Sequence, residues 1–285
     1  MFATASLARR IERAEMGLVL EGARAAARRV PPDQMIVHEF NGGAAVFVEA
    51  GAPFNKTVAL GFDGVPEPEV LDRLEQQFAE RQAPLQFEVA TLADPGVARA
   101  LTKRGYELVG FENVLALPLG PSSRFEPVPG VEVMRAGEDE SAAWLDAVAV
   151  GFMHPDTFDG PSSQPQLPRD VLDRVFGDTL VAPNFERYIA RRGGEVAGGG
   201  SFRMQDGIAQ LSGAATLPAH RRHGVQSALL RHRLAEAVRR GCDIAIVTTE
   251  PGSKSQENVQ KAGFALLYAR AVMVKASSSQ LPAAS

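Results

Sequence analysis

Residues 213–230 read GAATLPAHRRHGVQSALL, and this stretch decides how the second half of the chain is interpreted. Small and apolar residues lead into a proline, a basic turn with a single glycine follows, and apolar residues then recur at helical spacing. The pattern predicts a strand, a turn and an amphipathic helix. A helix start carries unpaired amide groups and partial positive charge. Because Gly224 lets the backbone approach an anion and Arg221 and Arg222 add charge, we expect a pyrophosphate to bind here.

This stretch resembles the acetyl-CoA signature of the GNAT (GCN5-related N-acetyltransferase) superfamily, which reads V-x-P-x-x-[RQ]-x-x-G-x-[GA]. The residues that fill its positions are Thr216, Pro218, Arg221 and Gly224. The second small residue of the signature is replaced by Gln226, whose side chain either crowds the pyrophosphate, points away from it or bonds to it.

A later stretch, residues 258–264 (NVQKAGF), resembles the family's second segment, a short helix closed by Gly-Phe. Together the resemblance covers residues 131–275 and implies an α/β (α+β) fold, in which a mixed, mainly antiparallel sheet is flanked by helices. The family often has a tyrosine that protonates the leaving thiolate, and its position is Val259 here. Tyr268 and Ser255 are the candidate substitutes, although a thiol pKa near ~8.5 lets the thiolate leave unassisted.

The first half of the sequence ends like the second. Residues 101–117 (LTKRGYELVGFENVLAL) and 259–275 (VQKAGFALLYARAVMVK) both predict a short helix, a Gly-aromatic stop and a strand. Their wide separation favours a duplicated domain, with chance similarity of two αβ segments as the alternative. In the first half the matching turn, residues 63–69, reads DGVPEPE; its acids repel a pyrophosphate and its prolines lack amide hydrogens.

We therefore predict two GNAT-like acyl-CoA N-acyltransferase domains. The division is a degenerate domain without the cofactor signature at 1–120, a proline-rich linker at 121–130, the acetyltransferase domain at 131–275 and a disordered tail at 276–285.

Hydrophobic periodicity and the Gly and Pro positions predict the individual elements. Helices are expected at residues 7–29, 67–81, 95–104, 138–152, 225–240 and 254–262. Strands are expected at residues 44–49, 57–62, 85–92, 107–117, 131–134, 188–191, 196–203, 208–216, 244–249 and 265–274. Residues 155–168 form a long loop with four prolines. The three glycines at 198–200 are expected to mark tight packing or a bend in a strand.

The resemblance also implies the site residues. The strand before the signature pairs with the pantetheine arm as an added strand does, and a backbone N–H near Thr216 or Leu217 stabilises the oxyanion. The candidate cofactor-binding residues are Ala215, Thr216, Leu217, Arg221, Arg222, His223, Gly224, Val225, Gln226, Ser227, Ser255 and Asn258.

Catalysis also needs a general base for the substrate amine. Glu250 follows a predicted strand, and His154 begins the long loop. Either could act as the base. Each also has a structural explanation: Glu250 as an acidic residue that stabilises a helix N-terminus, and His154 as an ordinary surface residue of the loop. Tyr268 is the third catalytic candidate, as the acid.

The composition argues against several other classes. The net charge of −4 disfavours general nucleic-acid binding, which needs a basic excess. No apolar run approaches ~18 residues, so no membrane-spanning helix is expected. Cys242 is the single cysteine and the histidines lack a zinc-ligand spacing, so we expect neither a disulfide nor a metal. The N-terminus lacks a signal-peptide core, and a cytoplasmic location is expected.

Together these features predict an N-acetyltransferase that moves an acetyl group from acetyl-CoA to a primary amine of a small molecule or amino-acid-like acceptor. That acceptor is the expected partner, without nucleic acid or membrane, and a homodimer is compatible with the sequence. An alternative enzyme is a tandem GNAT protein of the mycothiol synthase or aminoacyl transferase type. Gln226 and the missing tyrosine also suit a non-catalytic CoA-binding sensor or scaffold.

Overall fold

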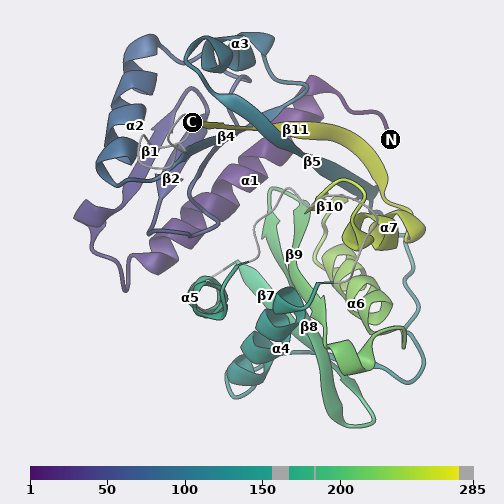
Figure 1. The fold of residues 1–285 in the computed structure, drawn as a ribbon. Helices are drawn as coiled ribbons and strands as arrows, with labels where there is room; N and C mark the ends of the chain where they lie inside the picture. Colours follow the sequence, from purple (N-terminus) through teal and green to yellow (C-terminus); the bar gives the residue numbers. More distant parts are fainter. Residues whose placement is uncertain (156–166, 183, 276–285) are drawn as a thin grey trace. The chain divides into compact units, whose positions relative to one another are not determined.

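The computed structural model describes residues 1–155, 167–182 and 184–275 (Figure 1). They divide into two compact units. The C-terminal unit is formed by Val114–Leu266, and the N-terminal unit by Phe2–Asn113 together with the chain from Leu267 on. The last strand therefore belongs to the N-terminal unit. The predicted division, with a linker at 121–130, instead places this strand in the C-terminal domain. That division of the sequence stays a prediction.

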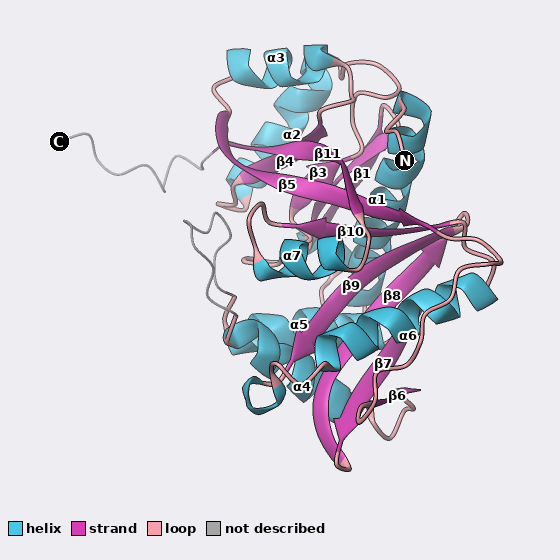
Figure 2. Cartoon of the chain, turned by 90° about the vertical axis from the view of Figure 1, so that its right-hand side faces the viewer, coloured by secondary structure: helices cyan, strands magenta, loops and turns pink. Residues whose placement is uncertain are grey.

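The C-terminal unit is built on a mixed sheet, seen in Figure 2. Its strands run in the order β10-β9-β8-β7-β6, with the second half of β5 (Glu107–Pro118) beyond β10. β6 to β9 are antiparallel, and β9 and β10 are parallel. The other elements are β6 (Glu132–Arg135), α4 (Ser141–Met153), α5 (Arg169–Leu180), β7 (Phe185–Arg192), β8 (Glu195–Gln205), β9 (Ile208–Thr216), α6 (Val225–Arg239), β10 (Ile244–Thr249) and α7 (Lys254–Lys261).

Helices cover both faces of this sheet, because neighbouring residues of a strand point to opposite faces. On β7, Tyr188 and Ala190 belong to the hydrophobic core under α6, whereas Ile189 belongs to the core under α4 and α5. Trp144 of α4 is fully buried and meets Phe176 of α5 edge-on, with 5.9 Å between the ring centroids. The expected mixed, mainly antiparallel sheet flanked by helices is thereby confirmed.

The N-terminal unit has the same kind of architecture. Its strands run in the order β1-β2-β3-β4-β11, followed by the first half of β5. The last strand pairs with β4 in antiparallel register, from Arg270 opposite Ala90 to Lys275 opposite Leu85. The elements are α1 (Ala5–Ala26), β1 (Ile36–Phe40), β2 (Gly43–Phe47), β3 (Lys56–Val58), α2 (Pro68–Glu80), β4 (Leu85–Ala90), α3 (Pro95–Lys103) and β11 (Ala265–Lys275).

The strands of the N-terminal unit are also covered on both faces. Ala44 and Val46 of β2 pack under α1, whereas Ala45 and Phe47 pack under α2. The alternation follows from the two-residue period of a strand. Each unit therefore has its own hydrophobic core.

The repeated sequences adopt the same local structure in the two units. α3 is followed by Gly105 (φ +83°) and the buried Tyr106, and α7 by Gly263 (φ +97°) and the buried Phe264. A left-handed glycine is the usual end of a helix, since other residues are strained there. The predicted Gly-aromatic stop is confirmed in both places.

One α-helix and one strand were missed, and β3 is half as long as expected. β1 forms a hairpin with β2 through Asn41 and Gly42, although only β2 was predicted. α5 follows Pro168 directly, where we expected the meander to begin. β3 ends at Val58, because Ala59 adopts a positive φ of 65° that leaves the strand. Most of the predicted loop at 155–168 and the tail lie outside the described residues.

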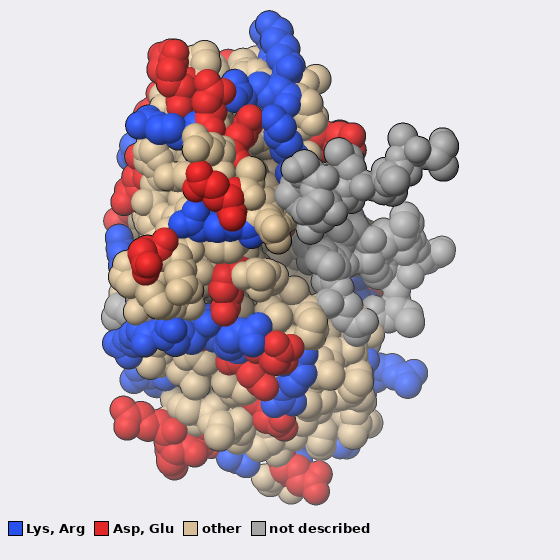
Figure 3. Space-filling model, turned by 60° about the vertical axis from the view of Figure 1, so that its left-hand side comes forward, with Lys and Arg blue, Asp and Glu red and all other residues tan. Residues whose placement is uncertain are grey.

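Acidic and basic side chains are interspersed on the face drawn in Figure 3, in keeping with the small net charge of −4. Within the described chain, no helix is both long enough and apolar enough to cross a membrane.

Candidate functional site

The basic turn of the signature connects β9 to α6. A short 3-10 turn, Pro218–His220, leads into the loop before Val225, the first residue of α6. Gly224 is the N-cap residue in left-handed conformation (φ +81°), and it supplies no side-chain cap. The first amides of α6 therefore lack the side-chain acceptor that usually caps a helix, which leaves them suited to an anionic ligand.

The glycine in this turn also has a packing role. A Cβ at Gly224 would lie 2.9 Å from Cγ1 of Val128, which belongs to the proline-rich segment 121–130. Arg221 donates a hydrogen bond to the main-chain oxygen of His154. Arg222, by contrast, is exposed beside the helix start with a positive φ of 62°. Of the two arginines, Arg222 is therefore the freer to meet a ligand.

β9 and β10 stop pairing before either strand ends. They are paired in parallel over Ile208–Gln210 and Ile244–Ile246, yet β9 continues to Thr216 and β10 to Thr249. Among the described residues, the β10 side of residues 211–216 has no strand partner. The backbone of this segment is therefore unpaired on the β10 side, and we call this unpaired region the opening between the two strands.

Both strand ends carry an orphaned hydroxyl. Thr216 Oγ1 and Thr249 Oγ1 are buried without a hydrogen-bond partner in the described part of the chain. Buried polar groups of this kind are rare and unfavourable unless water or a ligand bonds to them. They mark the strand ends as polar places where a ligand can gain hydrogen bonds.

A β-bulge between β8 and β9 lies within the part of β9 that is not paired with β10. The pairing register shifts between Gly199 and Ser201, so that one residue of β8 opposes two of β9. A Cβ at Gly198 would lie 2.5 Å from the carbonyl oxygen of Ala215, and one at Gly199 would lie 2.8 Å from Val148. Of the two alternatives predicted for these glycines, tight packing or a bend, the tight packing is confirmed.

A cavity of about 580 Å³ lies beside the start of α6. It is lined by α6, α7 and the segment around Phe125. Three predicted cofactor residues, Gln226, Ser227 and Asn258, line it. Ser255 is also on α7 but is exposed and does not line this cavity.

Sequence reasoning missed Arg124, Phe125 and Lys261, which line this cavity. Arg231, one of the arginines that the sequence concentrates around the proposed phosphate site, lines it too. Its Nη1 donates to the carbonyl oxygen of Glu126 at 3.3 Å and so holds the segment against α6. Arg124 and Phe125 belong to no sequence motif, so no signal in the sequence pointed to them.

The predicted site residues at the end of β9 and the start of α6 differ in burial and in whether their backbone amides are already bonded. Ala215 is buried where Gly151 of α4 packs against it, and a Cβ on that glycine would lie 2.3 Å from the Ala215 Cβ. The Leu217 amide donates to the Ala197 carbonyl oxygen at 3.0 Å. This amide is therefore already used by the sheet, and we withdraw it as an oxyanion donor. Val225 is buried in the core and holds the helix start in place.

The two candidate bases lie in the C-terminal unit. Glu250 is half-buried directly after β10, and its main-chain oxygen accepts from the Ser253 amide at 3.2 Å. His154 is exposed at the end of α4. Val259, at the usual tyrosine position, is buried in the hydrophobic core and offers no acid.

Tyr268 belongs to the N-terminal unit and has a different setting. Its hydroxyl donates to Glu12 Oε1 at 2.7 Å inside a buried ionic cluster that also contains Arg270. Burial and the Glu12 carboxylate raise the pKa of Tyr268, so the phenol keeps its proton. We therefore assign it no proton transfer at the coenzyme site.

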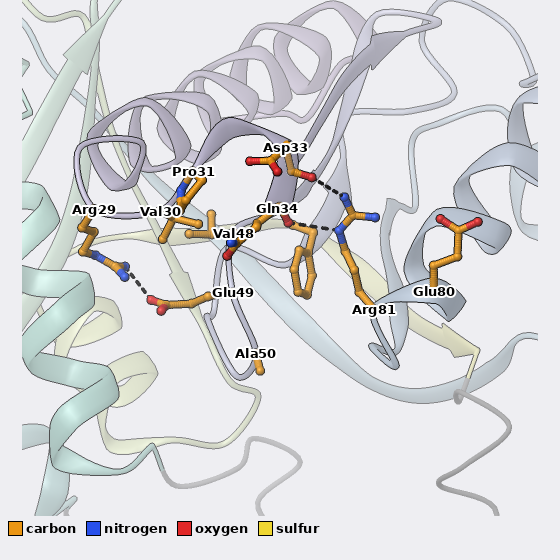
Figure 4. A pocket seen from close by; sticks show the side chains of 11 residues that line it. Arg29, Val30, Pro31, Asp33, Gln34, Val48, Glu49, Ala50, Glu80 and Arg81 are labelled. Atoms are coloured by element: carbon orange, nitrogen blue, oxygen red, sulfur yellow. Dashed lines mark hydrogen bonds and ion pairs between the residues drawn. The ribbon is translucent and has the colours of Figure 1, made fainter.

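A second cavity, of about 640 Å³, lies in the N-terminal unit (Figure 4). Its arginines already bond to protein atoms. Arg29 pairs with Glu49 at 2.5 Å, and Arg81 donates to the main-chain oxygens of Gln34 and Asp33 at 3.0 and 3.2 Å. This cavity therefore lacks the uncommitted cation that an anionic ligand would need.

The described residues bring together no group of three or more His, Cys, Asp or Glu that could hold a metal ion. His232 packs against Tyr188, with 5.0 Å between the rings.

The comparison with protein families gives one match. Residues 153–264 match the acetyltransferase (GNAT) family. The matched region contains the turn, the strand opening and α7. No curated protein matches the sequence significantly.

Solved structures share the fold over most of the chain. A GCN5-related N-acetyltransferase from Kribbella flavida aligns with a TM-score of 0.64 at 17% identity, covering 93% of this chain and 96% of its own. A tandem GNAT protein from the clavulanic acid biosynthesis pathway gives 0.60 at 15% identity, with 90% and 88% covered. A GCN5-related N-acetyltransferase from Sphaerobacter thermophilus gives 0.51 at 18% identity, with 72% and 64% covered. Residues 153–264 therefore match the acetyltransferase (GNAT) family, and the chain shares the fold of GCN5-related N-acetyltransferases of known structure.

Proposed function

We propose that the chain is an N-acetyltransferase that transfers an acetyl group from acetyl-CoA to a primary amine of a small molecule. The opening between β9 and β10 beside the uncapped start of α6 carries the proposal. A pantetheine arm can pair with an unpartnered strand backbone, and a pyrophosphate with helix-start amides. Both features occur here on one strand–turn–helix segment.

The cavity beside α6 suits the nucleotide end of the coenzyme. Arg124, Arg231 and Lys261 supply positive charge for a ribose phosphate, and Phe125 and Leu230 supply apolar surface for a base. Arg222 would add charge at the pyrophosphate. The proposed path of the coenzyme thus follows α6 from the cavity to the strand opening.

The reaction depends mainly on placement and on charge stabilisation. The amine nitrogen attacks the thioester carbonyl carbon, a C–N bond forms, the C–S bond breaks and CoA leaves as its thiolate. Backbone amides of β9 in the opening would stabilise the negative charge on the carbonyl oxygen. The Leu217 amide is not among them, because it bonds to Ala197.

The amine also loses one proton, which a general base accepts. Glu250 and His154 are the candidates from this chain, both in the unit that carries the signature. The thiolate takes a proton from water, which a thiol pKa near ~8.5 permits. Glu250→Gln and His154→Asn should separate the two bases, since loss of the true base removes the acidic limb of the pH–rate profile, where the rate rises as the base loses its proton.

The N-terminal unit fits a degenerate GNAT-like copy. It repeats the sheet with helices on both faces and the Gly-aromatic stop. Its α2 starts at Pro68 after Glu67. The proline has no amide hydrogen to donate to a pyrophosphate, and the glutamate carboxylate repels one. We therefore place the coenzyme in the C-terminal unit alone.

The test combines binding with turnover. Calorimetry should show acetyl-CoA binding to the full chain, and a thiol assay across a panel of small primary amines should show amine-dependent release of CoA. No binding of acetyl-CoA or CoA would overturn the coenzyme assignment. Binding without turnover on any amine would instead favour a CoA sensor, the alternative that the buried Val259 supports.

A further inference from the structure

Arg233 is a charged side chain in the core of the C-terminal unit. Its side chain is 2% exposed and extends from α6 to strands β8 and β9. Its guanidinium donates to the carbonyl oxygens of Leu229 at 3.1 Å, Ser201 at 2.8 Å and Ser212 at 3.4 Å. Burial lowers the pKa of Arg233 to about 10, which leaves it cationic at neutral pH. A buried cation is costly, so its placement calls for a reason.

The two strand contacts of Arg233 lie at the bulge. Ser201 and Ser212 are opposite each other where regular pairing resumes. The Ser201 hydroxyl donates to the Ser212 carbonyl oxygen at 3.1 Å. A Cβ at Gly200 would lie 3.3 Å from Arg233 Cζ, so the glycine makes room for the guanidinium. Arg233 therefore fills and bonds the irregular part of the sheet.

These bonds set the direction of one peptide plane. The Ser212 carbonyl oxygen is held on the side of Ser201 and Arg233. In a trans peptide the next N–H points the opposite way, so the Gly213 amide is directed away from β8. On that side β9 has already parted from β10. Gly213 also has a φ of +53°, and a Cβ there would lie 3.0 Å from Ser201 Oγ.

We infer that Arg233 is a positioning residue of the acyl site, which fixes the β9 bulge so that the Gly213 amide points into the opening between β9 and β10. The identity of the bound group rests on the proposed function, whereas the geometry rests on the contacts above. The ligand class is a thioester carbonyl, whose oxygen is a hydrogen-bond acceptor. Arg233 itself does not touch the ligand.

The test follows the Gly213 amide in the full chain. In glycine-labelled protein its NMR signal should shift more with acetyl-CoA than with CoA, since only acetyl-CoA carries the acyl oxygen. The thioester carbonyl stretch of ¹³C-acetyl-CoA should move to lower frequency on binding. Arg233→Met should abolish both responses and lower kcat about 10- to 100-fold, with little change in KM.

Two further variants separate positioning from folding. Ser201→Ala removes one bond to the Ser212 oxygen and should reduce the same responses by a smaller factor, even if Arg233→Met fails to fold. Leu229→Ala creates a cavity in the same core and should leave the Gly213 shift and carbonyl frequency unchanged.

The outcomes distinguish the two proposals. Tight acetyl-CoA binding without any selective Gly213 response in the wild type overturns the role of Arg233 and leaves the coenzyme assignment standing. Equal responses in wild type and both bulge variants also overturn it. If the wild type binds neither acetyl-CoA nor CoA, the proposed function falls, and this role falls with it.

Discussion

The two units contain corresponding strand–turn–helix segments whose helix starts differ. In the C-terminal unit β9 leads through a basic turn to α6, whose N-cap residue, Gly224, provides no side-chain acceptor. In the N-terminal unit β3 leads through an acidic turn to α2, which begins at Pro68 after Glu67. Asp63 of that turn pairs with Arg9 at 3.1 Å. The same architecture thus offers amides and positive charge in one unit, and carboxylates and a missing amide in the other.

The parallel strand pairs differ in the same direction. β9 and β10 border an opening, whereas side chains of β3 and β4 contribute to a buried ionic cluster. Lys56 of β3 pairs with Glu88 of β4 and with Glu15 of α1, both at 3.0 Å. Arg270 of β11 bonds Glu12 at 2.8 Å. The N-terminal unit therefore satisfies its buried charges internally, which leaves no reason there to expect an anionic ligand.

The largest expected effect comes from breaking this cluster. Arg270→Met should lower the free energy of unfolding of the N-terminal unit by about 3–5 kcal/mol, because it leaves buried carboxylates without their cation. Urea unfolding monitored by circular dichroism measures the loss. Arg104→Met is the control, since its partners Asp72 and Glu75 lie nearer the surface, and it should cost less than about 1 kcal/mol. Equal losses would contradict an energetically distinct cluster.

The next largest expected effect is a decrease in the unfolding free energy as pH rises. Burial raises the pKa of Glu88 to about 7, against the attraction of Lys56. The folded state then binds more protons than the unfolded state, so the unfolding free energy falls as pH rises from about 4.5 to about 7. The slope is at most ~1.4 kcal/mol per pH unit. Glu88→Gln should reduce this slope in unfolding experiments across pH 5 to 8, whereas Glu12, whose pKa is also raised by burial, keeps a slope of the same sign.

Glu140 provides the control of opposite sign in the other unit. Arg191 lowers the pKa of Glu140, so its contribution is lost as pH falls through the lowered value. Glu140→Gln should leave the slope between pH 5 and 7 unchanged. A variant at Glu88 that keeps the wild-type slope would show that another group carries it.

A smaller effect tests the helix starts. Arg222→Glu gives the turn before α6 an acid like that of the N-terminal unit, and acetyl-CoA affinity should fall at least about tenfold. Arg239→Glu makes the same charge change at the far end of α6, where the side chain is 69% exposed, and should leave affinity within about twofold. Calorimetric affinities decide between the two, and an unchanged Arg222→Glu variant would remove the pyrophosphate from this turn.

The smallest effect concerns what the two units share. Gly105→Ala and Gly263→Ala each force alanine into a left-handed conformation and should cost about 1–2 kcal/mol in similar amounts. Gly177→Ala, inside α5 with open space around it, should instead stabilise by about 0.5–1 kcal/mol. Thermal unfolding measures all three, and a large difference between the two stop glycines would weaken the correspondence between the units.

Local signals account for the elements that were predicted well. β10 was predicted at its observed bounds, because an apolar run is flanked by turn residues on both sides. α5 was missed although Val171, Leu172 and Val175 follow helical spacing, since the preceding proline-rich stretch was interpreted as leading into strands. β1 was missed because its five residues alternate only weakly. Short elements are fixed by their partners more than by their own pattern.

The candidate site divides in the same way. The turn was found because its proline, arginines and glycine are adjacent in sequence. Arg124 and Phe125 were missed because their place in the cavity depends on the chain crossing over α6. An amide near Thr216 or Leu217 was expected to stabilise the oxyanion, but the Leu217 amide is used by its bond to the Ala197 carbonyl oxygen. Only the sheet register shows which amides are free.

The sequence by itself determined most of the α/β elements, the left-handed glycine before α6 and the opposite charge of the two turns, because each depends on residues close together in the chain. The tertiary structure alone decided that β11 pairs with β4, that β9 and β10 part after Gln210, and that Arg233 bonds the bulge. These depend on contacts between distant segments, in which strand register and buried hydrogen bonds are set by the packed core.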